Sequence, residues 1–376
     1  SSPAPPLATA IAEGDVAEQL ASIDFDSALA SEEARRGRCR SRMLREVLEP
    51  VELARLVGAA CGLRASHELA VVSKDHGSGV RITLSGLKLE LPPLVYVCGG
   101  SVNGRELDVV EALNIASGSW ETLPPMPTPR RWCSGAVLAG KLYVVGGHNG
   151  SGYLGTTERF DPQFGRWEEL PEMPSFREAC ALAVTGGLLY AMGGSHRDRA
   201  LSTAERFDPA VSNWEALPSM PYPRDACAAA AADGSVFLFG GRNAEEFLDS
   251  ADQFEVATGL WRALPPMPTA RLGSAAAAAQ GFIFVFGGHG IGQALAVAEA
   301  YNISAGSWES LPPMPTARLG CCAVSVAGRI CVLGGHTSDQ AVGDAEAFTL
   351  EPQWSWERLR PLPTPRYGCA GAAVVS

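Results

Sequence analysis

Residues 142–150 read LYVVGGHNG, and an apolar run that ends in a glycine pair recurs six times along the chain. The six runs are LVYVCGG, LYVVGG, LLYAMGG, VFLFGG, FIFVFGG and ICVLGG. Their second glycines follow one another at a constant interval, at Gly100, Gly147, Gly194, Gly241, Gly288 and Gly335. Internal repetition with a period of this length indicates a solenoid or a propeller rather than a fold with one irregular core.

Three further residue types keep the same register. A tryptophan follows each glycine pair, with a slip of one residue in the last repeat, at Trp120, Trp167, Trp214, Trp261, Trp308 and Trp356. An arginine follows each tryptophan, at Arg130, Arg177, Arg224, Arg271, Arg318 and Arg366. Between glycines and tryptophan, an acidic residue stands two positions before an aromatic or apolar one, at Glu111, Glu158, Glu205, Asp252, Glu299 and Glu346. One interpretation pairs each arginine with this acidic residue of its own or a neighbouring repeat; the other places the arginines on a binding face.

Each repeat is predicted to contain four short β-strands. The first follows the arginine and consists of small residues, as in SAAAAAQG at 274–281, and the second is the apolar run. Runs this short, bounded by glycine and rich in β-branched and aromatic residues, favour buried strands over helices. The third strand carries the acidic residue and its aromatic neighbour, and the fourth starts at the tryptophan and ends at prolines.

Four strands in a repeat of this length are typical of one β-propeller blade, whose crowded inner strand requires small residues. The first repeat lacks a first strand, whereas residues 366–376, RYGCAGAAVVS, form a first strand with nothing after it. These two pieces complete one blade if they pair, and the pairing removes free sheet edges. The sequence therefore predicts an all-β, six-bladed propeller over residues 91–376, closed by the C-terminal strand.

The combination of apolar run, glycine pair, acidic–aromatic pair, tryptophan and arginine resembles the kelch motif over about residues 91–376. Phrases such as GGHNGSGYLGTTERFDP are most similar to the Kelch-like group. That resemblance implies a kelch propeller that binds a partner protein or peptide and recruits it to a cullin-type ubiquitin ligase. The group also carries BTB and BACK domains ahead of the propeller. Only about 90 residues precede the first blade here, so the resemblance supports the recognition half of that role.

In the Kelch-like group, partner-binding residues come from the loop entering the first strand and from the loop after the glycine pair. Carried over position by position, the resemblance implies twelve residues, which we call the partner ring: Arg131, Glu178, Asp225, Leu272, Leu319 and Tyr367 before the first strands, and Ser101, His148, Ser195, Arg242, His289 and His336 after the glycine pairs. These positions vary between repeats while the framework does not, as expected of a recognition surface on a rigid scaffold. Two arginines provide positive charge, Glu178 and Asp225 negative charge, and the leucines and Tyr367 an apolar sector.

The sequence supports an enzymatic function less well than a binding function. The histidines after three glycine pairs suggest a metal site, but no carboxylate accompanies each at a fixed offset, so histidines on a shared loop surface are favoured. Galactose oxidase-like enzymes hold copper through Tyr and His on a related propeller, whereas Tyr96, Tyr143 and Tyr190 here lie within apolar runs where core packing is expected.

The glycine pairs end strands, whereas phosphate loops open helices. We therefore expect them at positions that require a positive φ or a close backbone approach. We predict no catalytic residue, metal or cofactor. The alternatives are a kelch-type enzyme, such as an oxidase or sugar isomerase, and a cytoskeletal or structural scaffold.

Residues 1–90 are predicted to form a short, mostly helical extension. Residues 1–30 are rich in alanine, proline and acidic residues and are expected to be flexible. Six arginines stand within 35–45, which fits a solvated helix face, a nuclear signal or a docking contact. Residues 50–62 fit an amphipathic helix, and the stretch around them loosely resembles the latter half of an F-box. Residues 69–91 alternate apolar residues and predict a hairpin.

Charge and cysteine usage narrow the class of protein further. The net charge of −11 argues against nucleic-acid or anionic-membrane partners, and no run approaches the ~18 apolar residues of a membrane span. Five of the ten cysteines occupy one repeat position, at Cys133, Cys180, Cys227, Cys321 and Cys369. Thiols on separate blades behave as small buried apolar groups. We therefore expect a reducing compartment, cytoplasmic or else nuclear.

Overall fold

The structure, a computed structural model, describes residues 93–350 and 353–374 and the backbone of four short strands before them. The chain divides into two units, residues 1–91 and 92–376. In the first unit β1 (Arg64–Ala65) pairs with β4 (Leu89–Glu90), and β2 (Val71–Lys74) pairs with β3 (Val80–Thr83), both antiparallel. The second pairing falls within the segment for which the sequence predicts a hairpin. The helices predicted between residues 31 and 62 lie outside the described residues.

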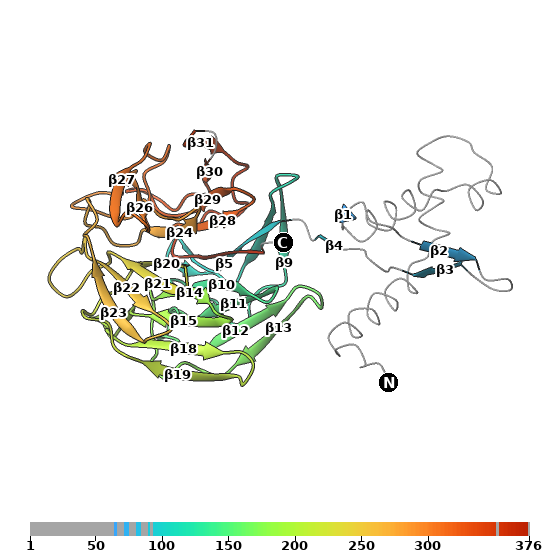
Figure 1. Ribbon diagram of the computed structural model, residues 1–376, viewed down its shortest axis with the longest axis horizontal. Coiled ribbons are helices and arrows are strands. Elements are labelled where there is room, and N and C mark those ends of the chain that lie inside the picture. The colour runs from blue at the N-terminus through green and yellow to red at the C-terminus, as the bar shows by residue number, and fades with distance from the viewer. Residues whose placement is uncertain are drawn as a thin grey trace. The chain divides into compact units, whose positions relative to one another are not determined.

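The second unit consists of six four-stranded antiparallel sheets arranged around a common centre (Figure 1). From the inner to the outer strand, blade 1 is β32 (Ala370–Val374), β5 (Leu94–Cys98), β8 (Val110–Asn114) and β9 (Ser119–Leu123), and blade 2 is β10 (Ser134–Leu138), β11 (Lys141–Val145), β12 (Thr157–Asp161) and β13 (Arg166–Leu170). Blade 3 is β14 (Ala181–Thr185), β15 (Leu188–Met192), β18 (Ala204–Asp208) and β19 (Asn213–Leu217), and blade 4 is β20 (Ala228–Ala232), β21 (Ser235–Phe239), β22 (Ala251–Glu255) and β23 (Leu260–Leu264). Blade 5 is β24 (Ala275–Ala279), β25 (Phe282–Phe286), β26 (Ala298–Asn302) and β27 (Ser307–Ser310), and blade 6 is β28 (Cys322–Val326), β29 (Arg329–Leu333), β30 (Ala345–Thr349) and β31 (Ser355–Arg358).

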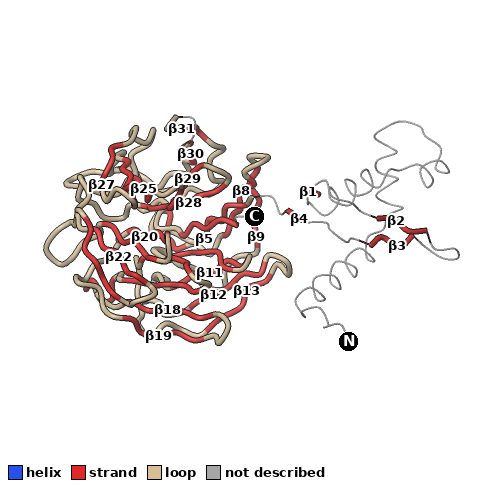
Figure 2. The backbone as a smooth tube through the Cα atoms, in the orientation of Figure 1, coloured by secondary structure: helices blue, strands red, loops and turns tan. Residues whose placement is uncertain are grey.

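Loops connect these strands (Figure 2). Two of the loops contain small two-stranded hairpins. They are β6 (Ser101–Val102) with β7 (Arg105–Glu106), and β16 (Ser195–His196) with β17 (Arg199–Ala200). The propeller is all-β over residues 93–350 and 353–374, as predicted. Within these same ranges no helix is long and apolar enough to cross a bilayer.

The C-terminal strand closes the ring, as the two incomplete repeats predict. β32 pairs antiparallel with β5, with Ala370 opposite Cys98 and Val374 opposite Leu94. The six inner strands then contact their neighbours around the whole ring, including β32 with β10 and with β28. The strands are crowded at Gly135 of β10, where even a methyl group would lie only 2.9 Å from Ala370 Cβ of β32.

The core lies between neighbouring blades and is closed at the rim by the repeat tryptophans. Tyr96 of blade 1 packs in one cluster with Leu142, Val144 and Phe160 of blade 2. Each repeat tryptophan donates its indole N–H to a backbone carbonyl just after the outer strand of the preceding blade, as Trp167 does to Pro124 at 2.9 Å. The carbonyls accepting from the six tryptophans belong to Arg360, Pro124, Pro171, Pro218, Pro265 and Pro312.

The repeat arginines are buried and paired with the repeat acidic residues. All six are 0% exposed, and each contacts the carboxylate of its own blade. The pairs are Arg130–Glu158, Arg177–Glu205, Arg224–Asp252, Arg271–Glu299, Arg318–Glu346 and Arg366–Glu111. Each also donates from Nη1 to the carbonyl of the first glycine of the pair, as Arg177 does to Gly193 at 2.9 Å. The pairing interpretation of these arginines is therefore the one observed.

Candidate functional site

The glycine pairs bring the two loops of each blade together at one end of the channel. Both glycines of every pair have a positive φ, for instance 61° at Gly146 and 99° at Gly147. They also lie close to backbone, since a methyl group on Gly147 would lie 2.7 Å from the carbonyl oxygen of Arg131. An L-residue with a side chain would be strained and obstructed there. The chain after the glycines consequently runs against the loop that enters the inner strand.

The partner ring forms six backbone pairs, one for each blade. The residue after the glycine pair and the residue after the repeat arginine exchange two N–H···O=C hydrogen bonds, as Arg131 and His148 do at 3.0 and 2.9 Å. The six pairs are Ser101–Tyr367, Arg131–His148, Glu178–Ser195, Asp225–Arg242, Leu272–His289 and Leu319–His336. The structure thus brings all twelve sequence-predicted residues to one face, two from each blade.

The next residue inward forms a second ring, which surrounds the channel. Its six members are Trp132, Ala179, Ala226, Gly273, Gly320 and Gly368, and we call them the mouth ring. Each donates its N–H to the carbonyl of the preceding member, at 2.7 to 2.9 Å, and the sixth bond closes the circle from Trp132 to Gly368. All six have a left-handed φ between 49° and 62°. The mouth ring fixes the positions from which the partner ring projects.

Exposure separates the twelve side chains of the partner ring. Ser101, Ser195 and Asp225 are buried, at 0, 5 and 5%, so their side chains offer little surface. Arg242 is exposed, and the other eight are half-buried.

Charge on this face is more balanced than the sequence suggests. Arg131 forms an ion pair with Glu106 at 2.9 Å, and Arg242 forms one with Asp225 at 3.0 Å. The expected positive contributions of the two arginines are therefore locally neutralised.

Glu178, unlike Arg131, Asp225 and Arg242, forms no ion pair with any residue that the structure describes. Its Oε2 is buried and accepts no hydrogen bond from any residue that the structure describes. Burial raises its pKa above the ordinary value, while His148 and Arg131 act in the opposite direction and Asp225 and Asp198 add to the rise. This carboxylate is held at the site with incomplete compensation.

Aromatic side chains extend the site on both sides of the channel. His336 packs edge-on against Tyr367, with ring centroids 5.0 Å apart, and Tyr367 packs edge-on against Trp132 at 6.1 Å. On the other side Tyr153 lies between His148 and His196, at 5.2 and 5.1 Å. Such pairs of rings stabilise one another beyond the area they bury, so the loops present an ordered surface.

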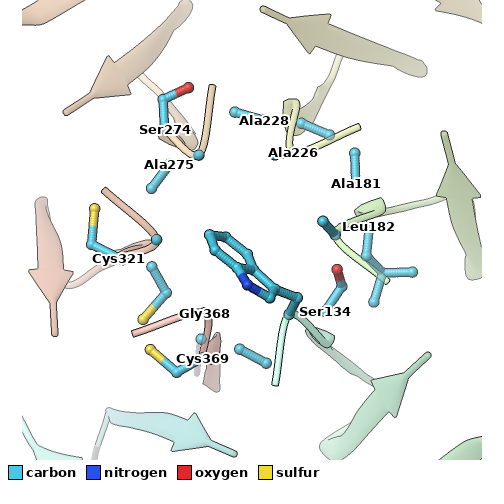
Figure 3. Close-up of a pocket in the computed structure, with 18 of the residues that line it drawn as sticks. Ser134, Ala181, Leu182, Ala226, Ala228, Ser274, Ala275, Cys321, Gly368 and Cys369 are labelled. Atoms are coloured by element: carbon cyan, nitrogen blue, oxygen red, sulfur yellow. The ribbon is translucent and has the colours of Figure 1, made fainter. Parts of the chain in front are cut away.

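Inside the mouth ring lies a cavity of about 150 Å³ (Figure 3). Its walls include the small residues at the starts of the inner strands, among them Ser134, Ala181, Ala228, Ser274 and Cys321, which are arranged around the centre of the view. Burial raises the pKa of the neighbouring thiols, to about 12 for Cys133 and Cys227, so these are inert as nucleophiles at neutral pH. Over the described ranges no three His, Cys, Asp or Glu side chains gather as a metal would require.

Comparison with known proteins identifies the repeat. The model of the KLHDC2/KLHL20/DRC7 Kelch-repeats domain matches residues 92–220 and 218–376. The chain belongs to the kelch-repeat family. Kelch propellers are in general protein-interaction modules, which is the class of function expected from the resemblance.

A solved structure supports the architecture. This kelch propeller is similar to the protein described as "Structure of YjhT", with a TM-score of 0.61 and 16% identity, over 69% of this chain and 96% of that one. At such identity the likeness shows the fold alone. No curated protein matches the sequence.

Sequence reasoning did not single out Trp132. The six residues that follow the partner-ring position read Trp, Ala, Ala, Gly, Gly and Gly along the chain, so one repeat places the largest side chain where the others place the smallest. Aligning the six repeats and comparing each position, including those occupied by small residues, would reveal Trp132 as the outlier. The ion pair of Arg131 was also missed, because Glu106 comes from the preceding blade and shares no repeat position with it.

Proposed function

We propose that this kelch propeller is a non-enzymatic interaction module that binds a protein or peptide segment at the face bearing the partner ring. The observation that carries the proposal is the convergence of twelve variable residues, paired two by two, around one end of the channel. A rigid scaffold that varies only at such positions is suited to recognition. The proposal includes an adaptor role that presents the bound partner to a cullin-type ubiquitin ligase, in a reducing cytoplasmic compartment.

Affinity purification with two matched variants tests the proposal. The full chain, the variant Leu319→Ser at the partner ring and the variant Val211→Ser are used as baits. Val211 is 68% exposed in the loop between β18 and β19, at the opposite end of the strands. We expect proteins recovered by the full chain and by Val211→Ser to be lost with Leu319→Ser. Equal recovery by all three baits would show that this face is not the binding face.

Two further readouts separate the finer parts of the proposal. Recovery of a cullin or its linker protein with the full chain supports the ligase role, and recovery of partners without either restricts the function to binding. Metal analysis of the purified protein addresses the enzymatic alternative. A stoichiometric transition metal would count against a non-enzymatic module.

A further inference from the structure

Trp132 occupies the mouth ring in a conformation that a bulky residue rarely adopts. Its φ is 49°, in the left-handed region that favours glycine. Three other members of the ring are glycine and two are alanine, so the backbone geometry requires no large side chain. Strain of this kind persists where surrounding structure enforces it, and it clusters at binding and catalytic sites.

The indole of Trp132 extends across the mouth toward two other blades. A methyl group on Gly368 of blade 1 would lie 3.1 Å from its Cδ2, and one on Gly320 of blade 6 would lie 3.1 Å from its Cη2. The two glycines therefore make room for the ring system. Each repeat tryptophan donates its indole N–H to a carbonyl, but Trp132 Nε1 meets no acceptor in the portion of the chain the structure describes. The indole is half-buried and lines the cavity, so part of it faces the open mouth.

Glu178 of the partner ring lies next to the backbone of Trp132. Its neighbour Ala179 donates its N–H to the carbonyl of Trp132 at 2.8 Å, which places the two residues at adjoining positions of the mouth. Arg131 pairs with Glu106 and Arg242 with Asp225, and the exposed Arg197 and Arg199 of the β16–β17 hairpin form no ion pair with Glu178. A buried carboxylate oxygen without a hydrogen-bond donor has lost hydration, and for Glu178 the charges of His148 and Arg131 compensate that loss only in part. Glu178 as a whole is half-buried and has no ion-pair partner among the described residues, so its carboxylate can receive a cation from a ligand.

We propose that the partner inserts a basic side chain, arginine or lysine, at the channel mouth, with its stem against the Trp132 indole and its charge at Glu178. This inference rests on the proposed function and specifies the chemistry of the partner. A long basic side chain buries its methylene groups on apolar surface while its head stays at a polar site, and a cation is attracted to the face of an indole.

Other anchors fit the mouth less well. An acidic side chain at the mouth would be repelled by Glu178, and the two arginines of the partner ring already have carboxylate partners. An apolar side chain would cover Trp132 but would remove water from Glu178 without supplying a donor, which is unfavourable. Charge complementarity therefore selects a basic group.

Four pools of immobilised peptides test the inference against the full chain. Each peptide carries randomised flanks around a fixed central residue, which is arginine, citrulline, leucine or glutamate. Citrulline has the shape of arginine without its charge. We expect the arginine pool to retain about tenfold more protein than the citrulline pool, as a charged hydrogen-bonded contact supplies. Trp132→Gly and Glu178→Gln are each expected to reduce retention on the arginine pool to that of citrulline, whereas Val211→Ser at the far face is not.

The outcomes distinguish this inference from the proposed function. Equal retention on arginine and citrulline overturns the inference. Preference for leucine or glutamate that disappears in Trp132→Gly overturns it too, but upholds binding at this face. Retention on no pool counts against both. A melting curve of each variant establishes that it is folded, and if Trp132→Gly does not fold, Glu178→Gln decides alone because it changes charge at nearly constant volume.

Discussion

Each buried arginine is surrounded by acceptors from its own blade. Arg224 donates from Nη1 to the carbonyls of Gly240 and Ser250, both at 3.2 Å, and its Nη2 contacts Asp252. A buried ion pair is stabilising relative to its broken form, because removing one partner leaves an uncompensated charge in the interior. The arginines hence connect the loop that enters each inner strand to the glycine turn and to the third strand.

The first prediction concerns this pair. Replacing Arg224 by methionine leaves Asp252 buried without a cation, and we expect a loss of about 3–5 kcal/mol of unfolding free energy. Urea denaturation measures it. The control is Arg206→Met, whose ion pair with Glu215 has side chains 37 and 50% exposed, and for which we expect less than about 1 kcal/mol. If both variants lose the same amount, the buried pair has no special structural role.

A second prediction concerns Arg242, whose side chain is 54% exposed while that of Asp225 is 8% exposed. Burial raises the pKa of Asp225, and Arg242 opposes the rise. Because the folded pKa lies above the unfolded one, ionisation of Asp225 disfavours the folded state, and its penalty disappears as the pH falls below the unfolded value. The variant Arg242→Gln enlarges this difference. We expect it to destabilise the protein at neutral pH and much less near pH 4.

Denaturation of Arg242→Gln and of the unchanged protein at both pH values measures this effect. An equal loss at both would show that Arg242 does not act through Asp225. The same coupling means that a charge reversal at Arg242 perturbs stability as well as recognition, because it places a second carboxylate beside a buried one. Glu178→Gln avoids this complication and is the better probe of binding.

At the scale of the strand, β32 decides whether the ring is closed. It supplies the inner strand of blade 1, and the residue preceding it by four, Arg366, supplies the cation for Glu111. Without both, β5 would become an exposed sheet edge, which pairs readily with other chains.

The third prediction is that a chain ending at Pro365 is strongly destabilised and associates. It lacks Arg366 and β32, so we expect a lower melting temperature and larger species in size-exclusion chromatography. Addition of a peptide of residues 366–376 is expected to restore both properties in part, since the missing strand is then supplied from outside. A truncated chain that melts like the full one would mean that closure contributes little.

A fourth prediction addresses the crowding of inner strands. A methyl group on Gly371 of β32 would lie 2.5 Å from Cys322 Sγ of β28, so Gly371→Ala forces the strands apart. Overpacking of this kind costs about 1–3 kcal/mol. Gly152 has open space around it and no positive φ, and Gly152→Ala is the matched control with no expected loss. Chemical denaturation of both variants compares them, and equal stability would contradict the crowding.

The strands could be predicted because the same residue pattern occurs in all six repeats. Each strand is supported by equivalent residues in every repeat, so the register of glycines, tryptophans and arginines indicates blades, order and closure together. The site was predictable only in position. Which side chains of the partner ring are exposed depends on how the two loops pair, and the contact of Arg131 with Glu106 joins residues of two blades. Trp132 is larger than the residues at the same position of the other repeats. Its indole reaches Gly320 and Gly368 in other blades, and the repeat pattern does not predict such a contact.

Considered as a whole, the propeller is linked around its circumference at three radii. The mouth ring closes through six backbone hydrogen bonds, the core clusters span neighbouring blades, and the indole N–H groups bind carbonyls of the preceding blade at the rim. In an open repeat array each unit contacts only its neighbours and the ends can fray. A closed ring has no end, so we expect the blades to unfold together.

Thiol alkylation tests this fifth prediction blade by blade. Cys133, Cys227 and Cys331 belong to blades 2, 4 and 6, all are buried, and burial raises the pKa of each to about 12. The native thiols are consequently protected twice, by exclusion of the reagent and by the scarcity of thiolate. In sub-denaturing urea we expect iodoacetamide to label the three at one common rate, set by global unfolding and read peptide by peptide in mass spectra. Labelling of Cys227 while Cys133 and Cys331 stay protected would instead show that blade 4 opens alone, and the ring would then be a set of independent blades.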